Sequence, residues 1–392
     1  MATSSMATGR PLLLGLLDRL DRDIAHSRLP REIPHLRAER AVLLARLGDF
    51  ERARQDLAFL RGLPESSTNP VLGAWMWLGE GVLDYFESLN QRARDRVLRA
   101  RALAVSAKSQ RIMALTSAWC AHFDYGVGDF PAMVRNLADA FHASAFDNHS
   151  ALTRACVIVA VAYHCGGSEE LAQPWYARAR SHATREGDGV SLSSISYNLA
   201  ALRIANTRLL EHFGVLDKVI AKRALLGVEA SAQLDLTVHA RALAPVSSIQ
   251  RAQILCVLEE FSDALTLFDQ HYDEAIAQGL ARDEAQLQAD RAWCLYRLGR
   301  GDEARDMVRS AQAALTWSTE RDGKAVAHAQ LARTCAALGL TDDVKTHARE
   351  AQVEYADYLA YTERLRANLA EAKLEALYPR EPPASSASAP SR

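Results

Sequence analysis

The sequence predicts an all-α protein, a right-handed superhelical solenoid of antiparallel helix pairs, and three observations support this prediction. Small residues recur at fixed spacings about every 40 positions. The alternation of β-branched residues that is typical of strands is nearly absent, while Ala, Leu, Arg and Glu dominate. The chain has 392 residues, of which 49% are hydrophobic, enough to bury a large core. One helical unit, repeated along the chain, accounts for all three.

The repeat is defined by spacings counted from turn glycines. Two helices approach closely only where no bulky side chain intervenes, and glycine is the residue best suited to end a helix in a left-handed conformation. The glycines are Gly48, Gly128, Gly167, Gly299 and Gly339. Seven positions earlier lie Ala41, Ala121, Ala160, Ala292 and Ala332; five later lie Ala53, Met133, Ala172, Ala304 and Val344; twelve later lie Leu60, Ala140, Ala179, Ala311 and Ala351. The same spacing fits turns at Ser88 and Glu259.

The elements follow in chain order. Residues 1–10 are rich in Ser, Thr and Ala and are expected to be disordered, and a lead helix covers about 11–26. Helix pairs are expected at about 34–62, 71–106, 108–145, 149–187, 245–279, 283–317 and 322–356, with a divergent unit at about 190–244. A capping helix at about 358–377 precedes a Pro/Ser/Ala-rich tail, 378–392, that is expected to be disordered. Residues 11–377 are therefore predicted to form one solenoid of about eight pairs.

This pattern resembles the tetratricopeptide repeat. Its signature of three small residues falls here on Ala292, Ala304 and Ala311, with Val308 near the usual aromatic position. The period is about 40 instead of 34, so longer helices are expected. Units of this length resemble the sensor arms of bacterial transcriptional activators, the N-terminal arms of diguanylate cyclases and the peptide-sensing regulators of quorum systems. The resemblance implies protein or peptide binding along a concave groove.

Charge and cysteine usage limit the partners and the compartment. The 46 basic and 48 acidic residues give a formal net charge of −2, so no electrostatic footprint for nucleic acid or an anionic membrane is expected. The apolar run at 12–17 is shorter than a signal-peptide core or a membrane span. The six cysteines form no Cys-x-x-Cys pair, which favours buried reduced thiols and a cytoplasmic location.

No motif for catalysis is found. The sequence lacks a phosphate-binding glycine loop after a strand, a Gly-x-Ser-x-Gly elbow, a His-Glu-x-x-His zinc motif and a cyclase signature. The twelve histidines are scattered. We therefore expect a protein that is not an enzyme and that carries no cofactor or metal; a homodimer is left open.

The candidate site is the groove lined by the first helix of each pair. Counting back from each turn selects aromatic, Arg and amide side chains, which are enriched at binding surfaces. They are Trp75, Tyr85, His122, Tyr125, Arg154, His164, Gln253, Gln286, Trp293, Tyr296, Arg297 and Arg333. The string Tyr197-Asn198-Leu199-Ala200 resembles the Asn-Leu-Ala string of peptide-binding relatives, which implies that Asn198 contacts the backbone of a ligand.

Two functions fit these expectations. The first is a non-enzymatic scaffold or adaptor that captures a protein or peptide segment in its groove. The alternative is a regulatory sensor that changes shape when a ligand or peptide binds and acts in trans on a signalling or transcription protein. The divergent unit at 190–244 favours the second, because a break in regular stacking can act as a hinge.

Overall fold

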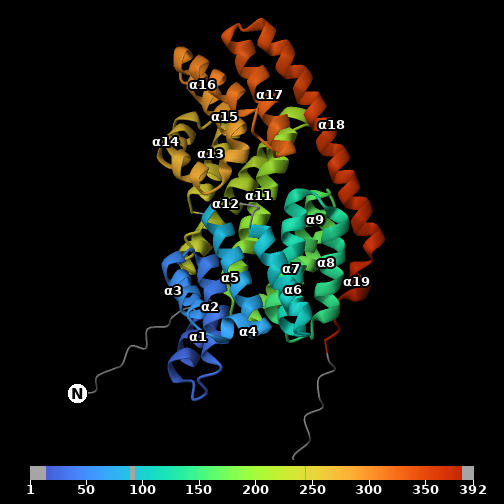
Figure 1. Ribbon diagram of the computed structural model, residues 1–392. Helices are drawn as coiled ribbons and strands as arrows, with labels where there is room; N and C mark the ends of the chain where they lie inside the picture. Colours follow the sequence, from blue (N-terminus) through green and yellow to red (C-terminus); the bar gives the residue numbers. More distant parts are fainter. Residues whose placement is uncertain (1–14, 89–92, 243, 382–392) are drawn as a thin grey trace, which may run out of the picture.

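The computed structural model describes residues 15–88, 93–242 and 244–381, and this part of the chain is helical without strands (Figure 1). The lower half holds α1 (Gly15–His26), α2 (Ile33–Leu47), α3 (Phe50–Arg61), α4 (Glu65–Thr68), α5 (Pro70–Ser88), α6 (Ala93–Ser106), α7 (Gln110–Val127), α8 (Phe130–Ala143), α9 (His149–Cys165) and α10 (Glu169–Glu186). The centre and upper half hold α11 (Gly189–Phe213), α12 (Lys218–Thr237), α13 (Ala244–Val257), α14 (Phe261–Ala277), the 3-10 helix η2 (Leu280–Asp283), α15 (Glu284–Arg297), α16 (Gly301–Ala314) and α17 (Arg321–Leu338). The last helices are α18 (Thr341–Ala372) and α19 (Leu374–Leu377).

Consecutive helices pack as pairs, α2 with α3, α5 with α6, and so on to α17 with α18. The five turn glycines have φ between 75° and 82°, the left-handed conformation in which glycine carries no steric penalty. Asp49 and Asp129 cap the next helices, where their carboxylates accept hydrogen bonds from the backbone N–H groups of Arg52 and Ala132. The prediction of an all-α, tetratricopeptide-like repeat of antiparallel pairs is confirmed.

The small residues of the repeat lie between the helices. Every residue at the three predicted offsets from the five glycines is buried, apart from Ala332 and Val344 of the last pair, which are half-buried. Ala292 on α15 is 0% exposed. Alanine at these positions lets the helix backbones approach each other, because it adds almost no volume between them.

Replacing Ala292 with arginine is expected to lower the free energy of unfolding by at least about 3 kcal/mol. The longer side chain overfills a closed contact and brings in a charge without a partner. Chemical denaturation measures the loss. The matched control is Ala313→Arg on α16, where the alanine is exposed. Equal stability of the two variants would contradict the helix register described here.

The fifth pair, α11 and α12, contacts the first pair, α2 and α3. The backbone N–H of Arg241, after α12, donates to the carbonyl of Leu47 at 2.9 Å. Next to this bond, a Cβ on Gly48 would lie 2.7 Å from the backbone nitrogen of Ala242. Arg46 at the end of α2 also pairs with Asp188, the N-cap of α11, at 2.9 Å. The lower half is therefore a closed ring of helices, which the sequence did not predict.

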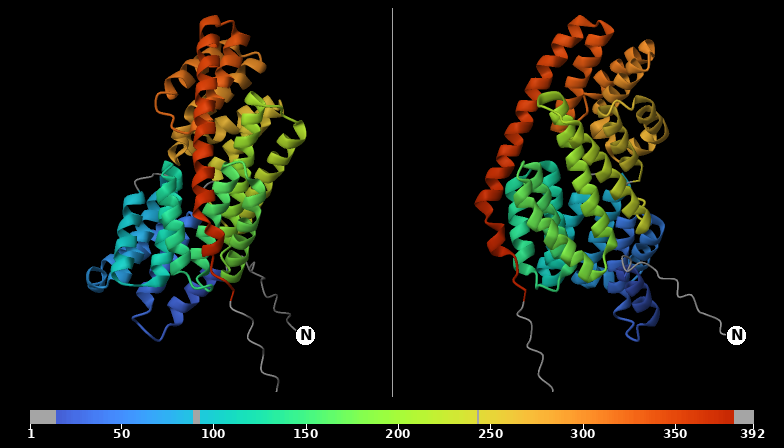
Figure 2. Two further views of the ribbon diagram at one scale, coloured as in Figure 1. Left: turned by 90° about the vertical axis from the view of Figure 1, so that its right-hand side faces the viewer. Right: turned by 180° about the vertical axis from the view of Figure 1, so that it is seen from behind.

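Helix α18 connects the two ends of the molecule. The sequence predicts separate helices to about 356 and from about 358, whereas α18 is continuous over 32 residues. It runs from the upper helices down to α8 and α9 (Figure 2). Tyr355 stacks on Phe213 with ring centroids 4.1 Å apart, and Tyr361 contacts Phe130 at 4.9 Å. Beyond it, Leu365 and Leu369 are buried in the core of the third and fourth pairs.

The predicted start of the C-terminal tail, at 378, also differs from the structure. Tyr378, which the sequence places in the tail, packs against Phe141 and Trp175, and Glu381 pairs with Arg185 at 2.9 Å. Ordered packing therefore extends past 377. The rest of the predicted tail, 382–392, and the predicted disordered residues 1–10 lie outside the described residues.

Five of the cysteines are buried, and Cys165 is half-buried. The Sγ atoms of Cys256 on α13 and Cys294 on α15 are 3.2 Å apart, a contact that sequence spacing did not indicate. Within the described ranges, no helix has both the length and the apolar composition needed to cross a bilayer.

Candidate functional site

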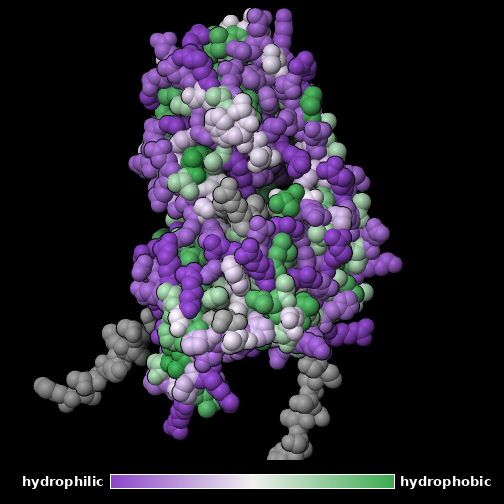
Figure 3. Space-filling view, viewed as in Figure 1, coloured by the Kyte–Doolittle hydropathy of each residue, from purple (hydrophilic) through white to green (hydrophobic). Residues whose placement is uncertain are grey.

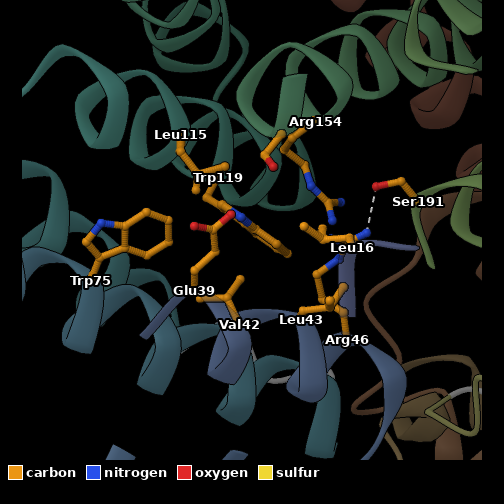
Figure 4. A pocket seen from close by; sticks show the side chains of 11 residues that line it. Leu16, Glu39, Val42, Leu43, Arg46, Trp75, Leu115, Trp119, Arg154 and Ser191 are labelled. Carbon is orange, nitrogen blue, oxygen red and sulfur yellow. Dashed lines mark hydrogen bonds between the residues drawn. The ribbon is translucent and has the colours of Figure 1, made fainter. Parts of the chain in front are cut away.

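The first helices of the pairs line two separate cavities, and we call this inner side of the helices the chamber. The lower cavity lies between α1, α2, α5, α7, α9 and the start of α11 (Figure 4). It is small, with a volume of about 30 Å³. Its walls combine aliphatic, indole and charged side chains: Leu16, Glu39, Val42, Leu43, Arg46, Trp75, Leu115, Trp119, Ser150, Arg154 and Ser191.

Two guanidinium groups meet in this cavity from opposite walls (Figure 4). Arg46 donates to Asp188 at 2.9 Å and to the hydroxyl of Ser191 at 2.7 Å. Arg154 lies 3.9 Å above the ring of Trp119 and has neither a hydrogen bond nor an ion pair with any described residue. Burial, together with the charge of Arg46, lowers the pKa of Arg154 to about 9. The Arg154 guanidinium therefore has no direct anionic partner among the described residues, and Asp188 acts on it only at longer range.

An aromatic cluster extends from Arg154 toward the upper helices. Trp119 and His122 contact each other edge to face at 5.5 Å, and His122 contacts Tyr85 at 5.0 Å. Burial lowers the pKa of His122 to about 3, so its ring is neutral at physiological pH. Burial raises the pKa of Tyr85, on which the charges of Arg282, Arg154 and Glu320 also act. Tyr85 thus lies within reach of charges from both cavities.

The upper cavity lies between α11, α13, α15 and α17 and has a volume of about 200 Å³. A space-filling view shows a hollow in the surface between the lower and upper groups of helices (Figure 3). The cavity has many polar side chains: Tyr197, Arg208, Gln250, Gln253, Arg282, Asp283, Gln286, Glu320 and Asp322. Apolar residues complete the wall: Ala201, Ile204, Ala205, Val246, Leu280, Leu287 and Val326.

Three carboxyl groups gather in the upper cavity around one arginine. Arg282 forms ion pairs with Glu320 at 3.3 Å and Asp283 at 3.7 Å. Burial, followed by repulsion from Glu320, raises the pKa of Asp283 to about 7 and of Asp322 to about 6. Within the part of the chain that the structure describes, no three His, Cys, Asp or Glu side chains are arranged to hold a metal ion.

Two carboxamides line the same cavity without partners. Gln253 on α13 is 8% exposed and Gln286 on α15 is 9% exposed, and neither forms a hydrogen bond with another described residue. Each carboxamide can donate and accept hydrogen bonds. Their amide atoms reach the solvent-accessible space of the cavity, so these two amides are available to a bound molecule.

Four predicted residues form a separate stack on α15 and α17. Trp293 and Tyr296 stack with centroids 5.6 Å apart, and Arg333 lies 4.0 Å above the Trp293 ring. The exposed Arg297 lies 5.3 Å from the same ring. Glu211 on α11 connects this stack to the upper cavity, because it pairs with Arg333 at 2.9 Å and also with Arg208.

The structure does not bring all predicted residues together. Trp75 and Arg154 line the lower cavity, and Gln253 and Gln286 line the upper one. His164 instead lies beside Tyr176 at 6.3 Å, and burial raises the pKa of Tyr125 beside Cys165. Asn198 is half-buried and is not among the lining residues, whereas its neighbour Tyr197 is.

Several site residues were missed by counting from turns. Tyr197, Ala201, Ile204 and Arg208 recur at helical spacing on one face of α11, a signal that helical periodicity could have found. Arg282, Asp283, Glu320 and Asp322 lie in or beside the connections between pairs, where no offset from a turn glycine points.

Solved structures resemble this chain at low sequence identity. Neither protein-family models nor curated proteins match the sequence. Among solved structures, a Rap protein complexed with Competence and Sporulation Factor is 15% identical, with a TM-score of 0.48, over 93% of this chain and 100% of that chain. Yeast Tom70 is 14% identical, with a TM-score of 0.35, over 93% of this chain and 88% of that chain. At these values we draw nothing about function from either protein.

The side chains that line the two cavities can bind a ligand through charge, hydrogen bonds and apolar contact. They include a guanidinium without an ion pair and two carboxamides without hydrogen-bond partners among the described residues, together with a carboxylate cluster and aromatic side chains. These groups can hold charged ends, hydrogen-bonding backbone groups and apolar side chains of a ligand.

Proposed function

We propose that this chain is a non-catalytic binding protein whose inner chamber takes a peptide or an extended protein segment. The observation that supports the proposal best is the pair of buried carboxamides, Gln253 and Gln286, that face the upper cavity without partners among the described residues. A peptide backbone presents alternating N–H and C=O groups, and carboxamides can satisfy both. The neighbouring Tyr197 and Ile204 supply apolar contact area.

A sensor role is the second candidate, and one observation favours it. The chamber is lined by helices of both halves, which are connected by α11 and by the long α18. A ligand that contacts both halves stabilises the arrangement in which both contacts are made, and so shifts the population of conformations. Such a protein would act in trans on a signalling or transcription protein.

Peptide capture from a lysate of the native cells tests the binding role. The protein is immobilised, washed and eluted with acid, and the eluted peptides are identified by mass spectrometry. Replacing both Gln253 and Gln286 with leucine is expected to reduce the recovered peptides at least about tenfold, since two hydrogen-bonding groups are lost in a desolvated site. The matched control is Gln173→Leu at an exposed position of α10.

The outcomes separate the proposals. A variant that recovers the same peptides as the wild-type protein would refute the assignment of the chamber as the binding site. The combined variant Asn198→Ala, Tyr296→Ala and Arg333→Ala tests the residues predicted from the sequence in the same assay. Small-angle scattering with and without a recovered peptide then distinguishes the two roles, since a sensor changes its overall dimensions and an adaptor does not.

A further inference from the structure

Gly323 leaves a gap beside the upper cavity. It is a buried residue in the first turn of α17, and its φ is not positive, so the backbone does not require glycine at this position. Glycine within a helix is less stable than alanine, which indicates a reason outside the helix. A Cβ on Gly323 would lie 3.2 Å from Oε1 of Gln286 and 3.3 Å from Oδ1 of Asp283. The missing side chain therefore keeps free the space next to two oxygen atoms of the cavity wall.

Negative charge exceeds positive charge in the upper cavity. Asp283, Glu320 and Asp322 line it, and Arg282 pairs with the first two at 3.7 Å and 3.3 Å. The second arginine of the wall, Arg208, is already paired with two carboxyl groups that are not among the lining residues. With the three carboxyl groups ionised, the cavity therefore carries two negative charges that Arg282 does not neutralise.

Two carboxamides are an independent indication of a ligand in the same place. Gln253 and Gln286 are more than nine-tenths buried, line the cavity and form no hydrogen bond with another described residue. An amide oxygen accepts hydrogen bonds from an N–H donor, as a carboxylate does. Because Oε1 of Gln286 and Oδ1 of Asp283 lie beside the same point at Gly323, a donor near this point can reach both oxygen atoms.

The rest of the wall is largely apolar, and the cavity is small. Its aliphatic side chains include Ile204, Val246, Leu280, Leu287 and Val326, and its volume is about 200 Å³. A cavity of roughly 150 Å³ holds benzene, so this one admits a ligand of about six to eight non-hydrogen atoms. The acidic and the aliphatic parts of the wall together fit a small organic cation with an aliphatic body.

We propose that the upper cavity binds a short aliphatic diamine, whose ammonium groups lie among Asp283, Glu320 and Asp322 and whose methylene chain packs on the aliphatic wall. Two ammonium groups match the two negative charges in excess. Gln253 and Gln286 accept hydrogen bonds from the ammonium N–H groups that the carboxylates do not reach. Putrescine and cadaverine, the linear diamines with four and five methylene groups, are of the size that the volume admits. This inference does not depend on the proposed function, because the diamine is bound without a peptide.

Diamine binding is expected to strengthen as the pH rises from 5 to 8. Burial, followed by repulsion from Glu320, raises the pKa of Asp283 to about 7 and of Asp322 to about 6, so both carboxyl groups are mostly protonated at pH 5. An ammonium group favours the ionised carboxylates, so at pH 5 its binding has to release protons. The diamine keeps its charge over this range, because alkyl ammonium groups have pKa values of about 10. The other charged or titratable groups around the two carboxyl groups are Arg208, Arg282, Tyr85 on α5, Tyr125 on α7, Cys165 on α9, Tyr197 on α11, and Tyr358 and Tyr361 on α18.

Isothermal titration calorimetry of the full-length protein tests the inference, with putrescine and cadaverine as the probes. At pH 8 and physiological ionic strength, we expect at least one of them to bind at least about tenfold more tightly than n-butylamine, which has one charge, and than butanediol, which has none. At pH 5 the affinity for the diamine is expected to be at least about fivefold lower. Equal affinity for diamine and n-butylamine, or no binding of either diamine, would overturn the inference.

Gly323→Ala is the most direct variant. It places a Cβ next to Gln286 and Asp283 and removes no charge, so it is expected to weaken diamine binding at least about fivefold. The fold is expected to persist, because alanine favours a helix more than glycine does. The matched control is Gly301→Ala at the start of α16, where a Cβ would have open space around it. Unchanged diamine affinity in Gly323→Ala would contradict the placement of the ligand.

Asp322→Asn tests the charge separately from the shape of the cavity. The amide keeps the size of the side chain and leaves one negative charge in excess, so the preference for the diamine over n-butylamine is expected to fall to less than about threefold. The matched control is Asp342→Asn, an exposed residue in the first turn of α18 as Asp322 is in the first turn of α17. A preference that stays at its wild-type value in Asp322→Asn would refute the pairing of charges. The comparison of pH 5 with pH 8 needs no variant and so remains valid even where a variant folds poorly.

Failure of this inference can be told apart from failure of the proposed function. If neither diamine binds while peptides are captured from lysate, the inference is wrong and the proposed function stands. If a diamine binds as expected and no peptide is captured, the proposed function is wrong and the inference stands. If both ligands bind, the diamine is expected to displace the captured peptides, because both need Gln253 and Gln286 in the same cavity.

Discussion

Replacing Arg208 with methionine is expected to lower the free energy of unfolding by about 3–5 kcal/mol at pH 8. Arg208 and Asp290 are both 1% exposed, and their ion pair connects α11 to α15 across the junction between the two halves. Without the guanidinium, the Asp290 carboxylate stays in a closed site without compensation. Urea denaturation of both proteins at one ionic strength measures the difference.

The pH dependence of this loss follows from the direction of the pKa shift. Burial raises the pKa of Asp290 to about 7, although Arg208 pulls it down. Its pKa is therefore higher in the folded than in the unfolded protein, and its contribution to stability falls as the pH rises through 7. Removing Arg208 raises the folded pKa further. The destabilisation is thus expected to be smaller at pH 5, where Asp290 is protonated, than at pH 8.

A double variant serves as the control. Arg208→Met combined with Asp290→Leu replaces both charges with apolar groups of similar size and is expected to recover most of the lost stability. Glu211 keeps its partner Arg333 in this variant. If the double variant is as unstable as Arg208→Met alone, packing by the Arg208 side chain, and not the unpaired carboxylate, would explain the loss.

The second large effect is expected at the lower end of α18. Leu365 and Leu369 are 0% and 1% exposed in the core of the third and fourth pairs, so Leu365→Ala and Leu369→Ala should each cost about 2–5 kcal/mol. Both leucines pack in the contact of α18 with α8 and α9. The double variant is therefore expected to release the end of α18 from α8 and α9 before the rest of the protein unfolds. Hydrogen exchange of the amides at 358–377 detects this release.

The control for this prediction lies on the same helix. Leu359 is 48% exposed, so Leu359→Ala removes the same atoms with little loss of buried area and should leave exchange unchanged. Slow exchange at 358–377 in the Leu365→Ala and Leu369→Ala double variant would show that other contacts hold α18 in place. Tyr361 and Tyr378, which also pack in this region, are the candidates.

The repeat was predictable because its cause is local. Each turn needs a glycine in the left-handed conformation and each close helix contact needs an alanine, as the φ of Gly128 and the burial of Ala121 show. The same residue spacing therefore recurs from unit to unit. The prediction of separate helices on either side of 357 was wrong, because the contacts that decide the length of α18 are not local. Nothing in the composition near Asp357 stops a helix, and what holds α18 straight is its contact with distant pairs.

The candidate site was only partly predictable. Offsets from turns found Arg154, Gln253 and Gln286, because these side chains share the inner face of the first helices. The charged groups of the upper cavity could not be found in this way. Asp283 and Glu320 come from connections 37 positions apart in the sequence, and they meet only because α15 and α17 pack together.

The bond from Arg241 to Leu47 and the contact of Gly48 with Ala242 also affect how the protein folds. In an open array each unit touches only its neighbours, so folding can start anywhere and spread, and terminal units can be removed. Here residues nearly 200 positions apart in sequence must meet before the lower half is complete. Such distant contacts raise the entropic cost of chain closure, so the protein is expected to fold more slowly than an open array of equal length and to lose the lower half as a whole when its first pair is deleted.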